Sequence, residues 1–133
     1  HSALAKCRIM GEYTAGYGIA RYMADPHEAD VDAALNLAGD LEALFTRGWY
    51  TGYEHWWSDC WMSTFAYGEN GNSTTDAMAA DSYVGSSYAA TNLKWVPTDK
   101  MWVGVEFLWG ERRNLNGQAA RARRLGLGVQ YNF

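Results

Sequence analysis

The sequence predicts an all-β fold, an antiparallel up-and-down meander of about six strands. Three observations lead to this prediction. Successive stretches alternate between apolar and polar side chains, the connections between them alternate between short and long, and the last stretch ends on the aromatic residue Phe133. Side chains along a strand point to opposite faces in turn, so each stretch would have one apolar and one polar face.

The composition agrees with strands joined by turns. The 133 residues include seven Trp, nine Tyr and fourteen Gly but only two Pro, which favours β-structure over a helical bundle. Mean hydropathy is -0.35 and no run of 18 apolar residues exists, so the sequence excludes a transmembrane helix. The net charge of -4 comes without a basic stripe, which argues against a nucleic acid partner.

The amino-terminal half contains three strand candidates, of which residues 9–17 are the weakest. In residues 49–57 the odd-numbered positions hold Trp, Thr, Tyr, His and Trp, and the even-numbered positions hold Tyr, Gly, Glu and Trp. In residues 61–68 the odd positions hold Trp, Ser, Phe and Tyr, and the even positions hold Met, Thr, Ala and Gly. Aromatic and β-branched residues at alternate positions favour strands over helices.

The carboxy-terminal half contains three more candidates, residues 82–96, 101–113 and 121–133. In the second of these, Val, Val, Phe and Trp share one face, while Gly, Glu and Arg dominate the other and Leu108 is the exception. In the last, Leu125, Leu127, Val129 and Tyr131 make one face wholly apolar, and the other face carries glycines, amides and one cation. A serine in place of Gly128 is therefore expected to be tolerated on the polar face.

The connections fall into two classes. Tight turns are predicted at residues 58–59 and 97–100, where Pro97 is preset for a central turn position. Longer loops are predicted at residues 18–40, 69–81 and 114–120. Outer-membrane barrels show this asymmetry, with short turns on one side of the membrane and long loops on the other. The apolar face of each strand would then meet lipid, and the polar face would line the lumen.

The longest connection has helical spacing in its second part. The apolar residues of the segment 30–45 recur three or four positions apart, which predicts a short helix. They are Val31, Leu35, Leu37, Leu41 and Leu44. We also expect the 18–40 connection to fold inward over the polar face.

The aromatic residues support the membrane interpretation independently of the alternation. Trp57, Trp61, Trp95, Tyr131 and Phe133 would gather at the edge of the tight turns. The residues expected at the opposite edge are Trp49, Tyr67, Tyr83 and Trp109. The eight residues between the two edges would rise about 20 Å along a tilted strand, close to the roughly 25 Å apolar band of membrane barrels. A soluble sandwich would explain the alternation but not this clustering.

Several segments taken together resemble one family of membrane channels. The residues that carry the resemblance lie at 18–22, 51–57, 92–98, 104–112 and 128–133. Their order and spacing over residues 8–133 resemble the carboxy-terminal part of DcaP-like outer-membrane porins. This resemblance implies a trimeric channel of about sixteen strands that passes small, often anionic solutes such as dicarboxylates. It also implies a bacterial outer-membrane location, contact with membrane lipid and lipopolysaccharide, no cofactor, and Phe133 as the signal for barrel assembly.

Six strands are too few to close a membrane barrel, since known ones begin at eight. We therefore expect residues 1–133 to be a single domain that forms the carboxy-terminal portion of a longer barrel. An open sheet edge is not tolerated in hydrocarbon, so further strands should complete it.

Seven charged residues are predicted to face the lumen. Two interpretations of this set are open. In the first, charges of both signs on one face create an electric field that selects solutes. In the second, opposite charges form ion pairs across neighbouring strands, for example Glu106 with Arg124, and so neutralise each other. The set consists of Arg8, Glu12, Glu54, Lys94, Glu106, Arg112 and Arg124.

The densest cationic cluster surrounds the last loop. It contains five arginines, Arg112, Arg113, Arg121, Arg123 and Arg124. These side chains would either concentrate anions at the channel entrance or bind the phosphates of surface lipopolysaccharide, because Arg121 and Arg123 share the lipid-facing parity. The sequence supports both interpretations equally.

Catalysis finds little support, so we expect a passive channel and not an enzyme. No Ser sits in a nucleophile elbow, and neither His27 nor His55 lies beside a candidate nucleophile. Asp25, His27, Glu28 and Asp30 could hold a metal, but a solvated acidic loop is the favoured interpretation. The spacing of Cys7 and Cys60 fits no metal site and leaves a disulfide and two thiols equally open. The alternative functions are an outer-membrane β-barrel enzyme and a soluble β-barrel that binds a small ligand.

Overall fold

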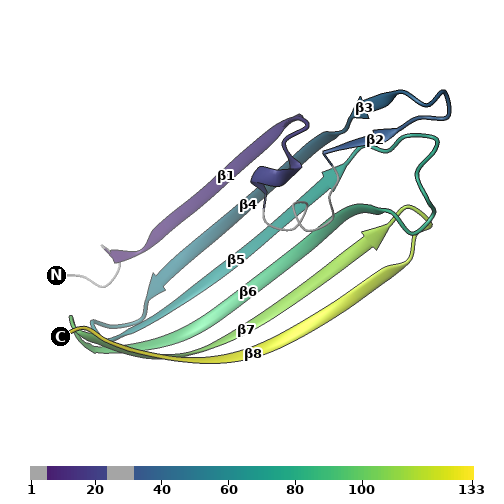
Figure 1. Ribbon diagram of the computed structural model, residues 1–133. Coiled ribbons are helices and arrows are strands. Elements are labelled where there is room, and N and C mark those ends of the chain that lie inside the picture. Colours follow the sequence, from purple (N-terminus) through teal and green to yellow (C-terminus); the bar gives the residue numbers. More distant parts are fainter. Residues whose placement is uncertain (1–5, 24–31) are drawn as a thin grey trace.

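The computed structural model describes residues 6–23 and 32–133. The predicted all-β meander is confirmed: six antiparallel strands pair in the order β1-β4-β5-β6-β7-β8, and a small second sheet pairs β2 with β3 (Figure 1). The sheet is not closed, because β1 and β8 each pair on one side only. The six strands are β1 (Arg8–Tyr17), β4 (Phe45–Trp56), β5 (Trp61–Asn72), β6 (Tyr83–Thr98), β7 (Met101–Asn114) and β8 (Ala119–Tyr131).

Two strands are longer than the alternation predicts. β4 begins at Phe45 instead of Trp49, and β5 continues to Asn72 instead of ending at Gly68. The added residues pair with each other, Arg47 opposite Gly71 for instance. They are largely polar or glycine, so the apolar pattern fades there. Backbone hydrogen bonds of the ladder do not depend on that pattern and continue.

The predicted helix at residues 30–45 is wrong over its described part, residues 32–45. β2 (Ala33–Leu35) and β3 (Leu41–Ala43) form a hairpin instead. Its turn contains Gly39 with a φ of 85°, and the backbone N–H of Asn36 donates to the carbonyl of Asp40 over 3.0 Å. Asn and Gly favour this turn more strongly than the leucine spacing favours a helix. One short 3-10 helix, η2 (Ala20–Tyr22), does lie in the connection.

The connections at the two ends of the sheet differ in length, as predicted, with one exception. At one end β4 and β5 are joined by residues 57–60, and β6 and β7 by residues 99–100. At the other end residues 18–44 join β1 to β4 in the sequence and residues 73–82 join β5 to β6, but the last connection, 115–118, is as short as 57–60. Asn114 and Gly117 close it into a compact turn. We call these the turn end and the loop end; the chain terminus after β8 lies at the turn end (Figure 1).

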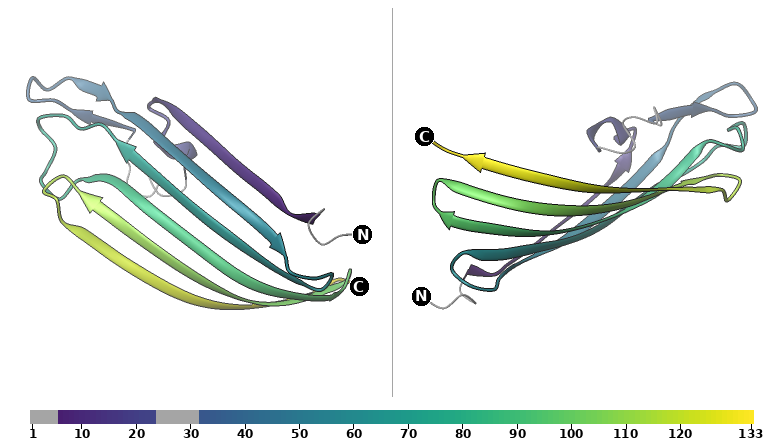
Figure 2. Two further views of the ribbon diagram at one scale, coloured as in Figure 1. Left: turned by 180° about the vertical axis from the view of Figure 1, so that it is seen from behind. Right: turned by 90° about the horizontal axis from the view of Figure 1, so that it is seen from below.

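The molecule is a single curved layer with almost no interior (Figure 2). Within the described residues, the buried hydrophobic side chains are those of Ala20, Leu44, Met62 and Tyr83. Three of them form one cluster at the loop end, against which Ala34 and Met78 pack. A soluble sheet normally buries one face on a second layer, and this sheet has no second layer among the described residues.

Tyr83 differs from the expectation that it belongs to an aromatic edge facing lipid. Its side chain is only 4% exposed and packs in the cluster with Leu44. A β-bulge between Tyr83 and Gly85 shifts the register, and the tyrosine hydroxyl reaches Asn70 and, over 3.1 Å, Ser86. Bulges re-aim side chains in this way, and simple parity counting does not detect them.

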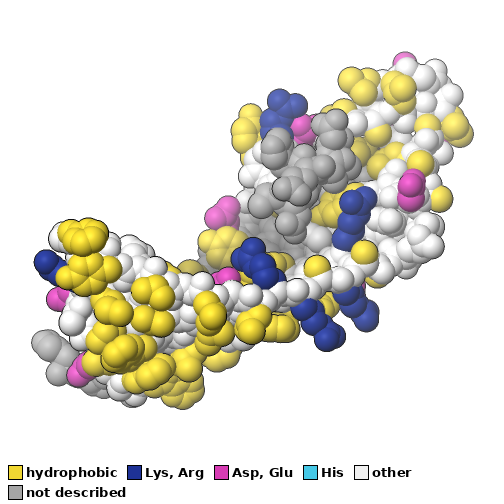
Figure 3. Space-filling model, turned by 60° about the horizontal axis from the view of Figure 1, so that its bottom comes forward, with side chains coloured by type: hydrophobic (Ala, Val, Ile, Leu, Met, Phe, Trp, Pro, Cys, Tyr) yellow, Lys and Arg dark blue, Asp and Glu magenta, His cyan; other side chains and the backbone are white. Residues whose placement is uncertain are grey.

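The strand register gives the sheet two faces. Apart from the two register shifts between β6 and β7, at Tyr83/Gly85 and Trp95/Thr98, even-numbered residues stand opposite even-numbered ones from β1 to β8. Examples are Arg8 opposite Glu54 and Asn92 opposite Glu106. We call the face of the even-numbered side chains the even face and the opposite one the odd face. Hydrophobic side chains gather toward the turn end, and most Lys and Arg lie nearer the loop end (Figure 3).

Candidate functional site

All seven residues predicted to face the lumen lie on the even face. Each has an even number, and the register holds this parity across all five strand pairs of the sheet. Four of the seven are cationic and three are acidic, so the set carries one net positive charge. The even face therefore has both signs of charge on one surface.

Neighbouring strands pair some of these charges. Arg8 Nη2 lies 3.3 Å from Glu54 Oε2, and Arg124 Nη2 lies 3.6 Å from Glu106 Oε1. The cross-strand pair that the sequence suggested between Glu106 and Arg124 is thus present. Both pairs are partly open to solvent, so each contributes little to stability. Their main effect is to fix the direction in which each charged group points.

The carboxy-terminal part of the even face is hollowed around Lys94. The hollow has a volume of about 270 Å³, and its floor is formed by glycines of β7 and β8. Lys94 Nζ lies 4.9 Å from the centre of the Trp102 ring, whose Nε1 donates to Gln130 Oε1 over 2.8 Å. Arg124 and Glu106 also line this hollow. We call it the Lys94 hollow. Its two cations and one carboxylate favour an anionic occupant.

A second hollow of about 460 Å³ lies on the even face where the chain after β1 folds back over the sheet. Tyr22 and Met23 line it together with Glu12, Tyr50 and Tyr88. The sheet leaves room for this segment through a glycine: a Cβ at Gly48 would collide with the end of the Met23 side chain. Residues 18–23 of the long connection thus lie over the even face, as expected.

An ion pair ties this segment to β2. Arg21 Nε lies 2.7 Å from Asp32 Oδ2, and the backbone N–H of Arg21 donates to Asp32 Oδ1 over 3.0 Å. Both hydrogen bonds stabilise the carboxylate, so the Arg21 side chain and backbone hold the pKa of Asp32 below its ordinary value. Residues 24–31, which include the acidic loop around His27, lie outside the described residues.

Arg112 lies at the loop end of the even face. Its Cζ is 5.6 Å from the centre of the Tyr83 ring, and its Nε donates to Asn114 Oδ1 over 3.1 Å. The tyrosine that parity placed on the other face therefore supports this arginine. A guanidinium held against an aromatic ring keeps its charge and loses freedom of movement.

The odd face is apolar over most of its length. Trp61 and Trp95 stand opposite each other near the turn end with ring centroids 6.4 Å apart, and Trp49 and Tyr67 lie nearer the loop end with centroids 5.7 Å apart. Between them runs one register row of mostly large apolar side chains. The row consists of Ile9, Tyr53, Phe65, Thr91, Phe107 and Leu125. All six except Thr91 are at least 38% exposed.

The odd face also has one cluster that the sequence analysis missed. Cys7 Sγ lies 3.6 Å from His55 Nδ1, and the Tyr53 hydroxyl lies 2.8 Å from the same nitrogen. Cys7 and His55 are 48 positions apart, so no local motif could reveal them. No disulfide joins Cys7 to Cys60. In residues 6–23 and 32–133, no group of three or more His, Cys, Asp or Glu side chains is placed to hold a metal.

The fold and its two faces define a class: a curved, open antiparallel sheet with one charged face and one largely apolar face. In the described part of the chain, no helix has the length and apolar character needed to cross a membrane. No family model, curated protein or solved structure matches the chain.

Proposed function

We propose that the chain forms part of the wall of a bacterial outer-membrane porin, similar to the DcaP-like family, that passes small anionic solutes by passive diffusion. The observation that carries this proposal is the contrast between the two faces of a one-layer sheet. The odd face exposes a continuous band of aromatic and aliphatic side chains, and the even face of the same strands exposes glycines and charges. In a membrane barrel, lipid would cover the apolar odd face and water would solvate the charged even face.

The alternative of a soluble, ligand-binding barrel accounts less well for the odd face. Leu125, Leu127 and Val129 are 71%, 86% and 69% exposed. Contiguous apolar patches of this kind are rare on soluble monomers. In a barrel that encloses its ligand, the apolar face would turn inward and the charged face outward. The 18–23 segment, however, covers the even face.

The proposal includes further strands beyond the six. β1 and β8 each leave one row of backbone N–H and C=O groups without a strand partner in the described sheet. Such edges are not tolerated in hydrocarbon, where each orphaned group costs several kcal/mol. A complete barrel, assembled as a trimer in the manner of the porins that the sequence resembles, would satisfy both edges.

The preference for anions rests on the Lys94 hollow. Among the described residues Lys94 contacts the Trp102 ring and forms no ion pair, whereas Arg124 is matched by Glu106. Lys94 is thus the cation of this hollow that no carboxylate matches. Carboxylates of a passing solute would be drawn toward it.

Single-channel recording of the complete barrel in planar bilayers tests the proposal. We expect discrete conductance steps and a reversal potential that favours anions. Lys94→Glu should move that potential toward cations and Glu106→Gln should move it further toward anions, because these changes alter the charge of the same hollow in opposite directions. Arg121→Gln, which removes a charge from the odd face, is the control and should leave selectivity unchanged. Absence of conductance steps, or a chain that stays monomeric in water without detergent, would overturn the proposal.

A further inference from the structure

The charges on the odd face are confined to one end. In the six-stranded sheet, the charged residues of this face lie in three successive register rows near the loop end, and none lies among the apolar rows toward the turn end. Four are arginines and two are glutamates, so the group has a net charge of plus two. They are Arg47, Glu69, Glu111, Arg113, Arg121 and Arg123.

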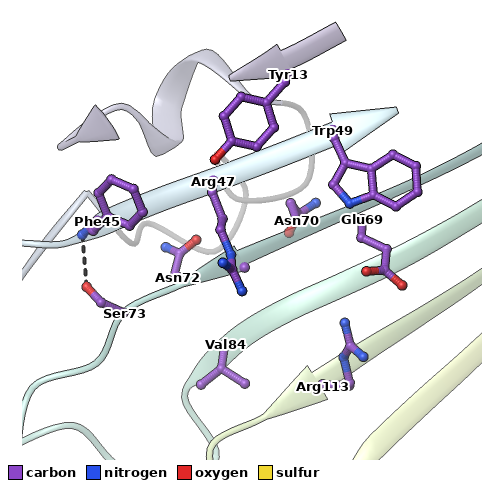
Figure 4. Close-up of a pocket in the computed structure, with 11 residues that line it drawn as sticks. Tyr13, Phe45, Arg47, Trp49, Glu69, Asn70, Asn72, Ser73, Val84 and Arg113 are labelled. Carbon is purple, nitrogen blue, oxygen red and sulfur yellow. Dashed lines mark hydrogen bonds between the residues drawn. The ribbon is translucent and has the colours of Figure 1, made fainter. Parts of the chain in front are cut away.

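Two of these arginines line one hollow together with Gly71. Arg47 on β4 and Arg113 on β7 lie in one register row, and the residues between them are Gly71 and Gly85. Three strand spacings separate the two Cα atoms by about 14 Å. The hollow between them has a volume of about 740 Å³. The two side chains extend into it toward each other (Figure 4).

The glycine at position 85 is required by close backbone contact. A Cβ there would lie 2.6 Å from the carbonyl oxygen of Asn70, so no other residue fits without moving β5 or β6. The two positions between Arg47 and Arg113 in the register row therefore carry no side chain. The hollow is large enough for a group bigger than a single ion.

The charges of the odd face are unequally neutralised. Arg121 Nε lies 2.6 Å from Glu111 Oε2, so this pair carries no net charge. Glu69 accepts a hydrogen bond from the Tyr67 hydroxyl over 2.5 Å. Arg47, Arg113 and Arg123 form no ion pair among the described residues, and all three are exposed.

Directly next to Arg123 the surface becomes apolar. The register row of Arg123 also contains Trp109 and Tyr67, and the following row contains Phe107 and Leu125. A ligand lying across this border would meet cations with one part and aromatic or aliphatic carbon with the other. That combination fits an anionic lipid, with its headgroup at the arginines and its acyl chains on the apolar rows.

We propose that Arg47, Arg113 and Arg123 form a binding site for the phosphate groups of a lipid headgroup. Guanidinium groups bind phosphate through two parallel hydrogen bonds, which favours phosphate over a diffuse negative charge. The site rests on the proposed function, since it requires the odd face to lie against lipid. It also separates the arginines around the last loop: Arg113, Arg121 and Arg123 lie on the lipid side, and Arg112 and Arg124 lie on the even face.

The experiment measures co-flotation of the complete barrel, which contains this chain, with vesicles of phosphatidylcholine, with or without bisphosphorylated lipid A. The test variant is Arg113→Gln with Arg123→Gln. The matched control is Arg112→Gln with Arg124→Gln, which removes the same two charges from the same two strands, each one residue away and on the opposite face. We expect wild type to bind the lipid A vesicles more strongly. The gain should fall about fivefold per arginine removed, shrink with added salt, and persist in the control.

The outcomes separate this inference from the proposed function. If the chain binds phosphatidylcholine vesicles but lipid A adds nothing, or if the control loses as much as the test variant, the phosphate site is overturned and the membrane proposal stands. If the chain binds neither kind of vesicle, both fail. Binding of the test variant to plain phosphatidylcholine equal to that of wild type shows that its apolar face is intact.

Discussion

At the scale of single residues, two glycines on the even face of β8 differ in a way that parity does not reveal. A Cβ at Gly128 would lie 2.7 Å from the Trp102 ring, whereas a Cβ at Gly126 would meet nothing closer than 4.0 Å. This close approach argues against the expectation that Gly128→Ser is tolerated. Gly128 is the platform on which the indole lies, and that indole in turn contacts Lys94.

We predict that Gly128→Ala destabilises the folded sheet and that Gly126→Ala does so much less. Overpacking a filled site costs roughly 1–3 kcal/mol. The displaced Trp102 should also lose its hydrogen bond to Gln130 and move away from Lys94. Urea unfolding in detergent, with indole fluorescence as the signal, measures both effects. Equal midpoints for the two variants would show that the Trp102 ring moves aside without cost.

A second residue, Leu127 on the odd face, separates a lipid environment from water. Its side chain is 86% exposed. In water Leu127→Arg would change stability little, since surface substitutions usually fall within about 0.5 kcal/mol. Against the middle of a bilayer the same change should cost roughly 2–4 kcal/mol. We predict the larger value.

The measurement for Leu127→Arg is the free energy of unfolding from lipid vesicles. Gly126→Arg, one residue away on the same strand but on the even face, is the matched control and should be close to neutral, because a Cβ there meets nothing closer than 4.0 Å. A near-neutral Leu127→Arg in vesicles would contradict the assignment of the odd face to lipid.

At the scale of secondary structure elements, the strands were predictable and the connections were less so. Alternation located all six long strands. Neighbouring residues such as Glu106 and Phe107 point to opposite faces of the sheet, and because one face is charged and the other apolar, their polarity alternates along the strand. It failed where both faces are polar, at residues 69–72, and where a bulge re-aims Tyr83. The hairpin of β2 and β3 was missed because the turn around Asn36 and Gly39 outweighs leucine spacing.

The candidate site follows the same division. The even face was predictable residue by residue, since parity alone places Lys94 and Arg124 on it. The hollows were not predictable, because they depend on which residues of four strands share a row. The contact between Cys7 and His55 is also a property of register across 48 positions.

The segment that covers the even face is predicted to respond to acid through Asp32. Its pKa is held below the ordinary value of 3.8 by Arg21, so the ionised carboxylate favours the docked arrangement. This contribution is complete above the ordinary value and is lost as the pH falls through the lowered one. The segment should therefore stay docked at neutral pH and loosen only in strong acid.

Asp32→Asn should loosen the same segment at every pH, since the amide cannot form the ion pair. The contact between the Met23 methyl group and Gly48, followed by nuclear Overhauser effects in detergent, reports docking. Glu42→Gln on β3 is the matched control in the same connection and should keep the contact. A contact in Asp32→Asn as strong as in wild type would show that Arg21 does not hold the segment.

At the scale of the whole molecule, Phe133 is predicted to act in assembly and not in conduction. It is fully exposed beyond β8 and stacks edge-on with Tyr131, with ring centroids 5.3 Å apart. Tyr131 belongs to the odd face, so this ring contact lies away from the charges of the even face. Deletion of Phe133 from the complete barrel should reduce the amount of heat-modifiable trimer in the outer membrane, while the assembled channels keep their conductance. Normal amounts of trimer after the deletion would contradict this role.

The near absence of an interior sets the calorimetric behaviour of the sheet. The heat capacity of unfolding arises mainly from apolar surface that becomes hydrated, and ordinary domains gain about 12–15 cal/mol/K per residue. Here the large side chains of the odd face are already exposed in the folded chain, and only four hydrophobic residues among the described ones are buried. Transfer from a bilayer into water, and not the loss of strand pairing, would therefore supply most of the heat capacity change. The curvature of stability with temperature would then be set by the surrounding lipid.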